Sequence, residues 1–477
     1  MNKIAAPSSL EAETYFRKSF SEYSKTFLLD ELRSTTYARL DRLKHVYLDY
    51  TGGGLYADSQ VHAHMGLMLN HVFGNTHSTN PTSIVTSTLI DQAQAYVLSF
   101  FNASPDEYFI IFTQNATGAL KLVGESYPFG GDSQYLLISD NHNSVNGIRE
   151  FARARGATVS YSPVIPPDLR IDGAALRTRL ARANPQAHNL FAYPAQSNFS
   201  GVQHSLEWIA QARSQGWDVL LDAAAYAPTN RLDLSAIHPD FVAISFYKIF
   251  GYPTGLGCLI ACKRALSQLH RPWFSGGTIT VASVQGNRHF LHDGAEAFED
   301  GTLNYLGIPA VEIGLRHIDA IGYDVIHTRV ACLTDWLLNE LHALHHDNGL
   351  PVVHIYGPAT AEARGGTIAL NFYGTDGHFI DHLVVEDRAN RAGISLRTGC
   401  FCNPGAGELA LGISTDELSA CFAQVAAQFT FDDFRRCFDE RSTGAVRISL
   451  GLVSNFTDVH RFLEFAHGFL NKCATMT

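Results

Sequence analysis

Short apolar runs alternate with amphipathic segments through the middle of the chain. Continuous hydrophobic stretches of strand length occur at residues 108–112, 135–138, 219–221 and 241–246. Between them, residues 116–124 and 144–155 carry patterns typical of helices. Strands that alternate with helices at this spacing predict an α/β fold, built on a mostly parallel sheet with helices on both faces.

The pattern changes near residue 315. A long helical stretch over residues 308–344 precedes strand candidates at 352–356 and 367–372, which predicts a second, smaller α+β domain. The first 44 residues have a helical pattern and no clear strand partner. We therefore expect an N-terminal helical arm at residues 1–44, a large domain at 45–315 and a small domain at 316–477, with the arm beside the small domain.

The composition narrows the class of protein without naming its chemistry. The 477 residues leave room for two or three domains of about 150 residues, and the 46% hydrophobic content excludes a disordered chain. The net charge of −11 argues against nucleic acid or an anionic membrane as the main partner. No apolar run approaches the roughly 18 residues of a membrane span, and the first residues lack the apolar segment of a secretory signal. We expect a cytoplasmic enzyme that acts on a small molecule.

Asp222 and Lys248 follow two neighbouring strand candidates. Asp222 precedes three alanines, Ala224 among them, and Lys248 leads into a Gly- and Pro-rich loop. In open α/β sheets, ligands bind beyond the carboxyl ends of the strands. Pyridoxal phosphate requires a lysine that bonds to its aldehyde and a carboxylate that keeps its pyridine nitrogen protonated. The pair favours a pyridoxal-phosphate site, with Ala224 small enough to lie against the ring. The alternative is a surface lysine and a helix-capping aspartate.

Two further strand-to-helix turns carry weaker signals. Backbone amides and the Thr117 hydroxyl at the start of the predicted helix could bind a phosphate, although Thr113 or Asn115 could simply cap that helix. His142 follows the strand candidate at 135–138. An imidazole there could stack on a cofactor ring and move protons, or be an ordinary polar loop residue.

The eight cysteines include one pair with possible chemistry. No CxxC pair occurs, which argues against a zinc ribbon, and no metal site is expected. Cys400 and Cys402 lie in a Gly- and Pro-rich loop, three and five residues after Arg397. A thiol on a mobile loop near a cationic group can act as a nucleophile, although both could be small apolar residues in a turn. We expect that second role for the other six, Cys258, Cys262, Cys332, Cys421, Cys437 and Cys473.

Taken together, these segments resemble the class V branch of fold type I pyridoxal-phosphate enzymes. Within it, the chain is most similar to the cysteine-desulfurase-like domain of molybdenum cofactor sulfurases. Eight segments carry the resemblance in the family's order, over roughly residues 46–465. They are YLDYTGGGLYADSQ, FGNTHSTNPTS, FTQNATGALKLVGE, YPAQSNFSG, DFVAISFYKIFGYPTGLG, FEDGTLNYL, LRTGCFCNPGAG and VRISLG.

The resemblance implies a fold type I architecture with a seven-stranded type of sheet, and a role for each matching residue. Lys248 would bond to the cofactor aldehyde, Asp222 would pair with the pyridine nitrogen and His142 would stack on the ring. Asn198 would lie near the ring and the substrate. The implied phosphate ligands are Ala116, Thr117, Ser245 and, across a homodimer interface, Thr302.

The resemblance also assigns the residues that meet the substrate. Arg447, in VRISLG, matches the arginine that binds the substrate carboxylate. Arg397 matches the arginine five residues before the catalytic cysteine, which makes Cys402 the persulfide-forming nucleophile in place of Cys400.

The sequence departs from the family pattern in three places. Many cysteine desulfurases have a glutamine where this chain has Ala225, and a histidine where it has Tyr247. The tyrosine form is typical of the molybdenum cofactor sulfurase group. Eukaryotic sulfurases carry a further C-terminal domain, and the motif positions leave no room for one within these 477 residues.

The leading hypothesis is that L-cysteine is converted to L-alanine, with a persulfide on Cys402 that passes to an acceptor protein or cofactor. One alternative keeps the cofactor and changes the reaction to carbon–sulfur lysis or another class V reaction. The other alternative is a sulfur carrier or scaffold without catalysis.

Overall fold

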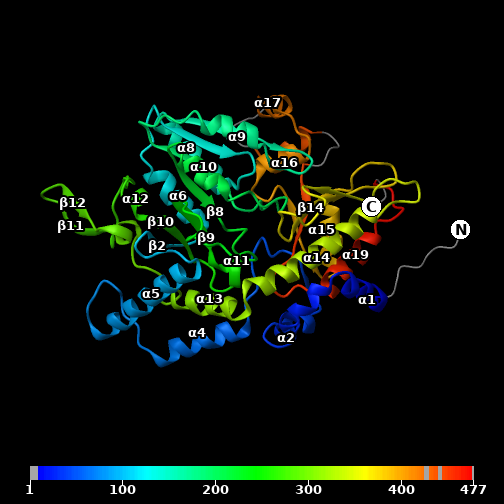
Figure 1. Cartoon of the computed structure of the whole chain (residues 1–477), viewed down its shortest axis with the longest axis horizontal. Coiled ribbons are helices and arrows are strands. Elements are labelled where there is room, and N and C mark those ends of the chain that lie inside the picture. The colour runs from blue at the N-terminus through cyan, green and yellow to red at the C-terminus, as the bar shows by residue number, and fades with distance from the viewer. Residues whose placement is uncertain (1–8, 424–428, 439–442, 475–477) are drawn as a thin grey trace.

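A seven-stranded mixed sheet forms the larger part of the molecule (Figure 1). The computed structural model describes residues 9–423, 429–438 and 443–474. The central strands run parallel, while β10 is antiparallel to both of its neighbours. In sheet order the strands are β2 (Tyr108–Thr113), β10 (Gly257–Cys262), β9 (Phe241–Ser245), β8 (Trp217–Asp222), β7 (Asn189–Pro194), β3 (Gln134–Ile138) and β4 (Thr158–Ser162). The predicted α/β class and mostly parallel sheet are confirmed.

Helices cover this sheet, and glycines divide two of the helical stretches that the sequence pattern predicted as continuous. The stretch at 144–155 is α7 (Asn143–Asn146) followed by α8 (Ile148–Ala154). The stretch at 308–344 is α13 (Pro309–Ile321) and α14 (Tyr323–Ala343), with Gly322 between them at φ +86°. Glycine adopts a positive φ without steric cost, so the helix can end at Gly322 and the chain can turn there. None of the helices in the described ranges is long and apolar enough to cross a membrane.

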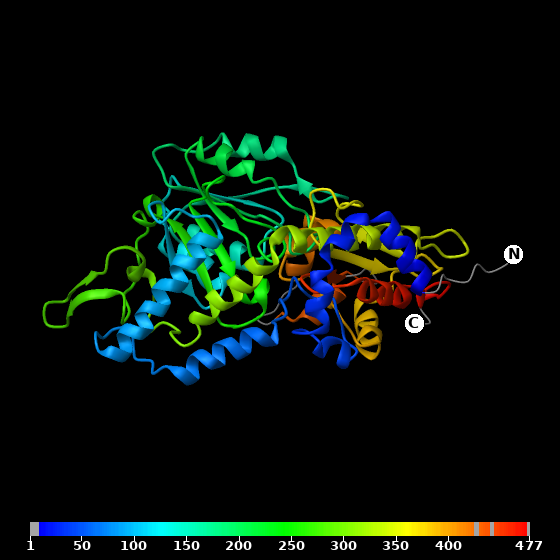
Figure 2. The same cartoon turned by 60° about the horizontal axis from the view of Figure 1, so that its bottom comes forward.

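A second sheet of four antiparallel strands lies at the end of α14 that is away from the seven-stranded sheet (Figure 2). Its order is β13 (Val353–Tyr356), β14 (Thr367–Phe372), β17 (Ala445–Ser449) and β16 (Arg397–Gly399). It has its own apolar cluster, which includes Trp336 of α14 and Phe456 of α19 (Phe456–His467). Phe16 of α1 (Ser9–Ser19) and Tyr23 belong to the same cluster, so the N-terminal helices pack there. The domain limits themselves stay a prediction.

Two buried arginines join the N-terminal helices to this second cluster. Arg33 of α2 (Leu28–Ser34) donates to Asp458 and to the Val453 carbonyl, both at 2.8 Å. Arg329 of α14 donates to Asp30 at 2.7 Å. Because a buried charge is costly unless it is paired, these contacts fix where the N-terminal helices lie.

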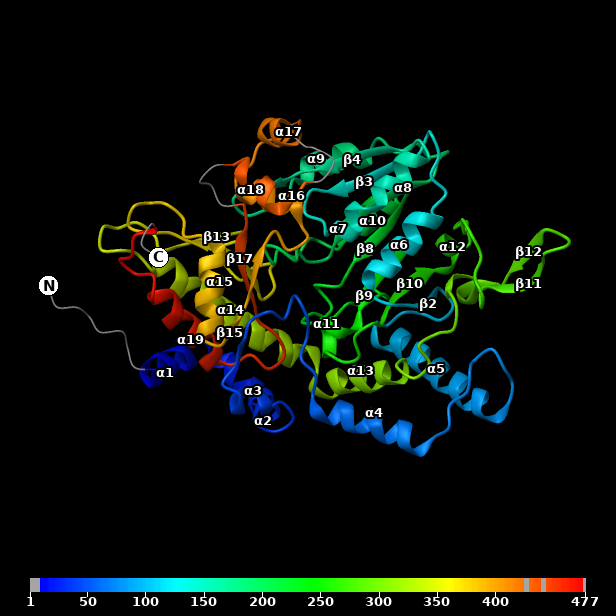
Figure 3. The same cartoon turned by 180° about the vertical axis from the view of Figure 1, so that it is seen from behind.

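A disulfide joins Cys421 of α17 (Thr415–Ala423) to Cys437, just after α18 (Phe431–Arg436). The expectation that these two cysteines are ordinary apolar residues is therefore wrong. Their Cα atoms lie 5.5 Å apart although the cysteines are 16 positions apart in sequence, because α17 and α18 lie near each other (Figure 3), with the Phe422 and Phe434 ring centroids 6.3 Å apart. That proximity is a tertiary feature that cysteine spacing alone does not encode.

Gly314 of α13 lies against Phe250, at the end of the short helix that carries Lys248. A Cβ atom at residue 314 would come within 2.1 Å of Cδ2 of the Phe250 ring. We expect Gly314→Ala to lower the free energy of unfolding by about 1–3 kcal/mol, because the added methyl group overpacks the contact. Denaturant titration with the far-ultraviolet circular dichroism signal measures this change.

Gly66→Ala in α4 (Asp58–Asn70) is the matched control for this substitution. Nothing lies within 4 Å of a Cβ at that position, so its stability should rise by up to about 1 kcal/mol through helix propensity. Equal stability of the two variants would contradict the contact between Gly314 and Phe250.

Candidate active site

A cavity of about 110 Å³ lies at the carboxyl edge of the seven-stranded sheet. Strands β7, β8 and β9 are parallel, so the segments that follow them meet at this edge. The cavity lining contains most of the residues predicted from sequence. They are Ala116, Thr117, His142, Asn198, Asp222, Ala224, Ser245 and Lys248, joined by Gln196, Ala225 and Tyr247.

Lys248 is on α11 (Phe246–Phe250), directly after β9. The helix ends at Gly251, whose φ of +79° and contact with Leu55 exclude any side chain there. Gly54 donates to the Tyr247 carbonyl at 3.0 Å, so the TGGG segment lies against this helix. Burial lowers the pKa of Lys248, and the nearby carboxylate of Asp222 opposes that shift. A lysine with a lowered pKa more readily supplies the neutral amine that reacts with an aldehyde.

Asp222 ends β8 and presents its carboxylate at the same cavity. Its Oδ1 accepts from the Ala224 amide at 3.0 Å, which fixes the carboxylate against the small Ala224. Within the described ranges, Asp222 makes no other side-chain hydrogen bond. Asp222 is 8% exposed, and its second oxygen has no protein donor within the described ranges. A ring N–H would satisfy it.

The start of α6 (Ala116–Ser126) forms a polar end of the cavity. Asn115 caps the helix by accepting from Gly118, as expected for an ordinary cap, and Ala116 donates to Ser245 Oγ at 3.0 Å. Gly257 allows this approach, because a Cβ there would lie 2.7 Å from Asn115 Cα. Backbone amides and hydroxyl groups at a helix N-terminus suit an anion.

His142 caps α7, with Nδ1 accepting from the Ser144 amide at 3.1 Å. Burial lowers the pKa of His142 more than Asp222 raises it, and the positive charges of Lys248 and Arg447 lower it further. The imidazole is therefore neutral near pH 7, a state suited both to stacking on a ring and to accepting a proton.

Asn198 connects the cavity to the loop that carries the two cysteines. Its Nδ2 donates to the Phe401 carbonyl at 2.7 Å, and its Oδ1 accepts from Asn403 at 2.9 Å. Cys402 therefore lies between two residues that Asn198 holds, although its exposed side chain is outside the cavity lining. Burial lowers the pKa of Arg447, and the negative charges of Asp49 and of a Cys402 thiolate oppose that shift.

Arg447 and Arg397 share one carboxylate, that of Asp49. Arg447 Nη2 lies 3.0 Å from Asp49 Oδ1, and Arg397 Nη2 lies 2.8 Å from Asp49 Oδ2. Arg447 also donates to the Asn198 carbonyl at 2.9 Å, and its buried Nε has no partner in the described part of the chain. Arg397 is half exposed, whereas Arg447 is almost fully buried. The Arg447 Nε–H is therefore a desolvated donor, but Arg447 is not among the residues that line the cavity.

Thr302 lies outside this cavity. It lines a separate hollow between α6 and the segment after η2 (Gly294–Phe298), and the Asn75 side chain donates to its hydroxyl at 3.5 Å. Its expected role required a second copy of the chain, so contact between Thr302 and a cofactor phosphate stays a prediction.

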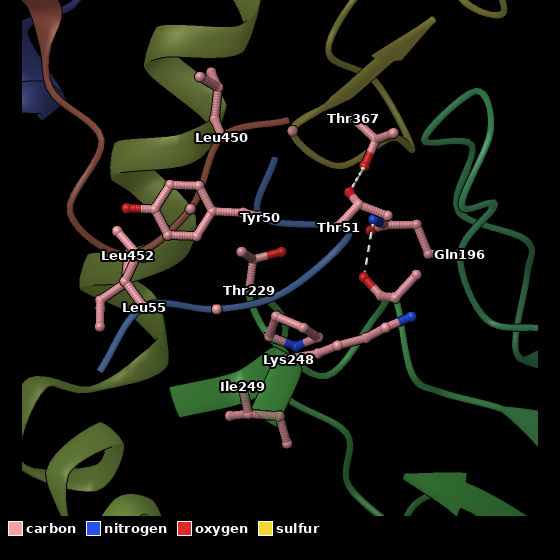
Figure 4. A pocket seen from close by; sticks show the side chains of 15 residues that line it. Tyr50, Thr51, Leu55, Gln196, Thr229, Lys248, Ile249, Thr367, Leu450 and Leu452 are labelled. Atoms are coloured by element: carbon pink, nitrogen blue, oxygen red, sulfur yellow. Dashed lines mark hydrogen bonds between the residues drawn. The ribbon is translucent and has the colours of Figure 1, made fainter. Parts of the chain in front are cut away.

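A second cavity, with space for about one water molecule, lies beside Lys248 (Figure 4). Lys248, Gln196 and Ala225 line both cavities. Gln196 Nε2 donates to the Ala225 carbonyl at 3.0 Å, so an amide side chain stands beside the position where many cysteine desulfurases have a glutamine. The sequence reasoning missed Gln196, although it lies two residues before Asn198 in the same motif.

Two further residues of the site were missed, Asp49 and Asp140. Asp140 follows β3 and accepts from Asn403 Nδ2 at 2.6 Å. Both carboxylates belong to segments that carried other predictions, YLDYTGGG and SDNHNSVNG. For Asp140 the available signal was a carboxylate just after a predicted strand, the same signal that pointed to Asp222, whereas no strand was predicted before Asp49.

Comparison with known proteins agrees with this architecture. The chain is 38% identical to the molybdenum cofactor sulfurase of Solanum lycopersicum, over 96% of this chain and 60% of that protein. It is 37% identical to the molybdenum cofactor sulfurase of Homo sapiens, over 92% of this chain and 51% of that protein. The chain therefore spans little more than half the length of these curated relatives.

The fold also matches solved structures. An apo cysteine desulfurase from Thermococcus onnurineus superposes with a TM-score of 0.77 at 22% sequence identity, over 92% of this chain and 98% of that one. The model of the aminotransferase class-V family matches residues 46–462. With a match of that length on the fold just described, the chain belongs to the aminotransferase class-V family.

Proposed function

We propose that this chain is a pyridoxal-phosphate-dependent cysteine desulfurase, which converts L-cysteine to L-alanine and leaves a persulfide on Cys402. The observation that carries the proposal is the set of Asn198 hydrogen bonds that connects the cavity lining to the segment around Cys402. Lys248 and Asp222 line the cavity, and Asn198, on the same lining, hydrogen-bonds the residues on both sides of Cys402. A carrier without catalysis would not need a lysine with a lowered pKa beside a carboxylate.

The donor set suits pyridoxal phosphate. Lys248 supplies the amine for its aldehyde, and the unpaired oxygen of Asp222 suits its protonated ring nitrogen. The start of α6 and Ser245 suit its phosphate, as does Thr117. When bound, this cofactor withdraws electrons from the α-carbon of an amino acid.

Residues of this chain would bind the substrate, transfer its proton and attack its sulfur. We assign the substrate carboxylate to Arg447, and its unpartnered Nε–H in the described part of the chain supports this role. Lys248 can take the proton of the α-carbon, because its lowered pKa favours the neutral amine. Cys402, on the turn that Asn198 holds, attacks the sulfur of the substrate as the thiolate.

The reaction balances without a further oxidant or reductant. The Cys402 sulfur bonds to the substrate sulfur, and the bond between that sulfur and the substrate β-carbon breaks. The electron pair of the broken bond stays with the carbon, which takes up a proton, so cysteine and the Cys402 thiol give alanine and a Cys402 persulfide. Passing the outer sulfur to an acceptor thiol or cofactor restores Cys402.

The proposal also includes the acceptor of the sulfur and the oligomeric state of the enzyme. Molybdenum cofactor is one candidate acceptor, because the relatives are named for it, although the chain spans only part of their length. A homodimer is expected because Thr302, away from the cavity of its own chain, would reach a phosphate only in a second copy. We expect the enzyme to act in the cytoplasm.

Cys402→Ser tests the nucleophile. Alanine formation from L-cysteine should fall by about two orders of magnitude or more, as expected when a group that acts on the reacting atom is removed. The visible absorbance of lysine-bound cofactor should remain. Cys400→Ser is the matched control, two residues away, and should retain activity. Equal alanine formation by Cys402→Ser and wild type would refute the assignment, and pyruvate with ammonia in place of alanine would favour carbon–sulfur lysis.

Arg447→Lys tests the carboxylate site. Lysine keeps the charge and loses the planar fork, so KM for cysteine should rise by about tenfold or more, equivalent to one charged hydrogen bond. Arg397→Lys should raise KM less, because Arg397 is half exposed and paired with Asp49. Steady-state kinetics measures both. A larger effect at Arg397 would move the carboxylate site to that arginine.

A further inference from the structure

The turn that carries Cys402 is held on three sides. The Phe401 carbonyl accepts from Asn198 at 2.7 Å, and the Cys402 carbonyl accepts from the Asn143 amide at 2.7 Å. Asn403 donates to Asp140 at 2.6 Å. The loop that the sequence suggested as mobile is therefore hydrogen-bonded at three successive residues, each to a segment that follows a strand of the large sheet.

The backbone of this turn is unusual. Phe401 and Cys402 both have left-handed conformations, with φ of +57° and +56°. Side chains other than glycine disfavour this region, so two successive residues stay there only when their surroundings hold them. The next residues approach closely as well, because a Cβ at Gly405 would lie 2.2 Å from the Ser139 carbonyl oxygen.

Asp140 is the charged member of these contacts. It is completely buried, as is Asn403. Its Oδ1 also accepts from Ser197 Oγ at 2.8 Å, and its Oδ2 lies 3.0 Å from His204 Nε2. A buried carboxylate needs donors around it, and here one of the three donor side chains is the residue next to Cys402.

We propose that Asp140 is a positioning residue for Cys402, which acts through Asn403 to hold the thiol at the mouth of the cavity. This inference rests on the proposed role of Cys402 as the nucleophile. Asp140 does not line the cavity, so it acts on the thiol and not on the cofactor. Losing this contact should therefore slow the attack on sulfur and leave the binding of cofactor and cysteine unchanged.

Asn403→Asp tests the contact with minimal change in shape. The new carboxylate still accepts from the Ala406 amide as the cap of α16 (Pro404–Ala410), but it presents an acceptor where the Asn403 amide donated to Asp140 and to Asn198 Oδ1. Measured at about pH 8, to limit proton sharing between the two carboxylates, kcat for alanine formation should fall between about 10- and 100-fold. KM for cysteine should stay within about twofold and the cofactor absorbance should persist.

The double variant Asp140→Asn with Asn403→Asp exchanges donor and acceptor. The amide introduced at residue 140 could then donate to the carboxylate at residue 403 while its oxygen faces His204, so kcat should recover at least in part. Asn102→Asp is the matched control. Asn102 also has a positive φ and donates to a carboxylate, Asp233 at 2.9 Å, on an exposed loop, and its replacement should leave kcat unchanged.

Alkylation of Cys402 by iodoacetamide, followed by peptide mass analysis, gives a readout that does not need desulfuration. Its rate should change in Asn403→Asp, should return toward wild type in the double variant and should not change in Asn102→Asp. A wild-type kcat and alkylation rate in Asn403→Asp would overturn the proposal, as would loss of the cofactor absorbance. If wild type itself forms no alanine, the proposed function fails, while the alkylation rates still decide the role of Asp140.

Discussion

The shared carboxyl edge of the parallel strands is the constraint on which the site depends. β3, β7, β8 and β9 run in the same direction, so whatever follows each of them must emerge on one side of the sheet. Asp140, Asn198 and Lys248 follow β3, β7 and β9, and Asp222 is the last residue of β8. No long-range signal is needed to bring these residues together, because strand direction alone does so.

Buried charge then ties the rest of the chain to that edge. Asp49, from the segment after β1 (Val46–Tyr47), pairs with Arg447 of β17 and Arg397 of β16. Leaving the buried Arg447 or the largely buried Asp49 unpaired would cost far more than an exposed ion pair gains, whereas Arg397 is half exposed. The four-stranded sheet and the segment after β1 are therefore held in one arrangement beside the cavity. The same arrangement leaves Arg447 Nε buried and unpartnered in the described part of the chain, which is the feature expected of a binding group before its ligand arrives.

The strands, Lys248 and Asp222 could be predicted because their signals are local. A short apolar run followed by a polar residue identifies both a buried strand and a residue at its end. The contact of Asp140 with Asn403 spans 263 residues, and that of Asp49 with Arg447 spans 398, so nothing near either residue in sequence indicates the partner. The disulfide between Cys421 and Cys437 was missed for a related reason, since it depends on how α17 and α18 lie relative to each other. Gly322 was visible in the sequence, but a glycine within a helical pattern does not by itself show that the helix ends there.

The role proposed for Cys402 requires its thiol to serve two environments, and the conformation of its turn suits that requirement. Lys248 and Asp222 work inside a cavity, where burial lowers the pKa of the lysine. Cys402 is exposed, where a sulfur acceptor can reach it. A thiol at this boundary must face the substrate and the solvent side from one position, or move between them. Two successive left-handed residues, clamped through Asn198, Asn143 and Asn403, favour the fixed position. The strain of that conformation is offset by the buried hydrogen bonds of Asp140, so the strand ends that carry Lys248 and Asp140 also determine where the Cys402 turn lies.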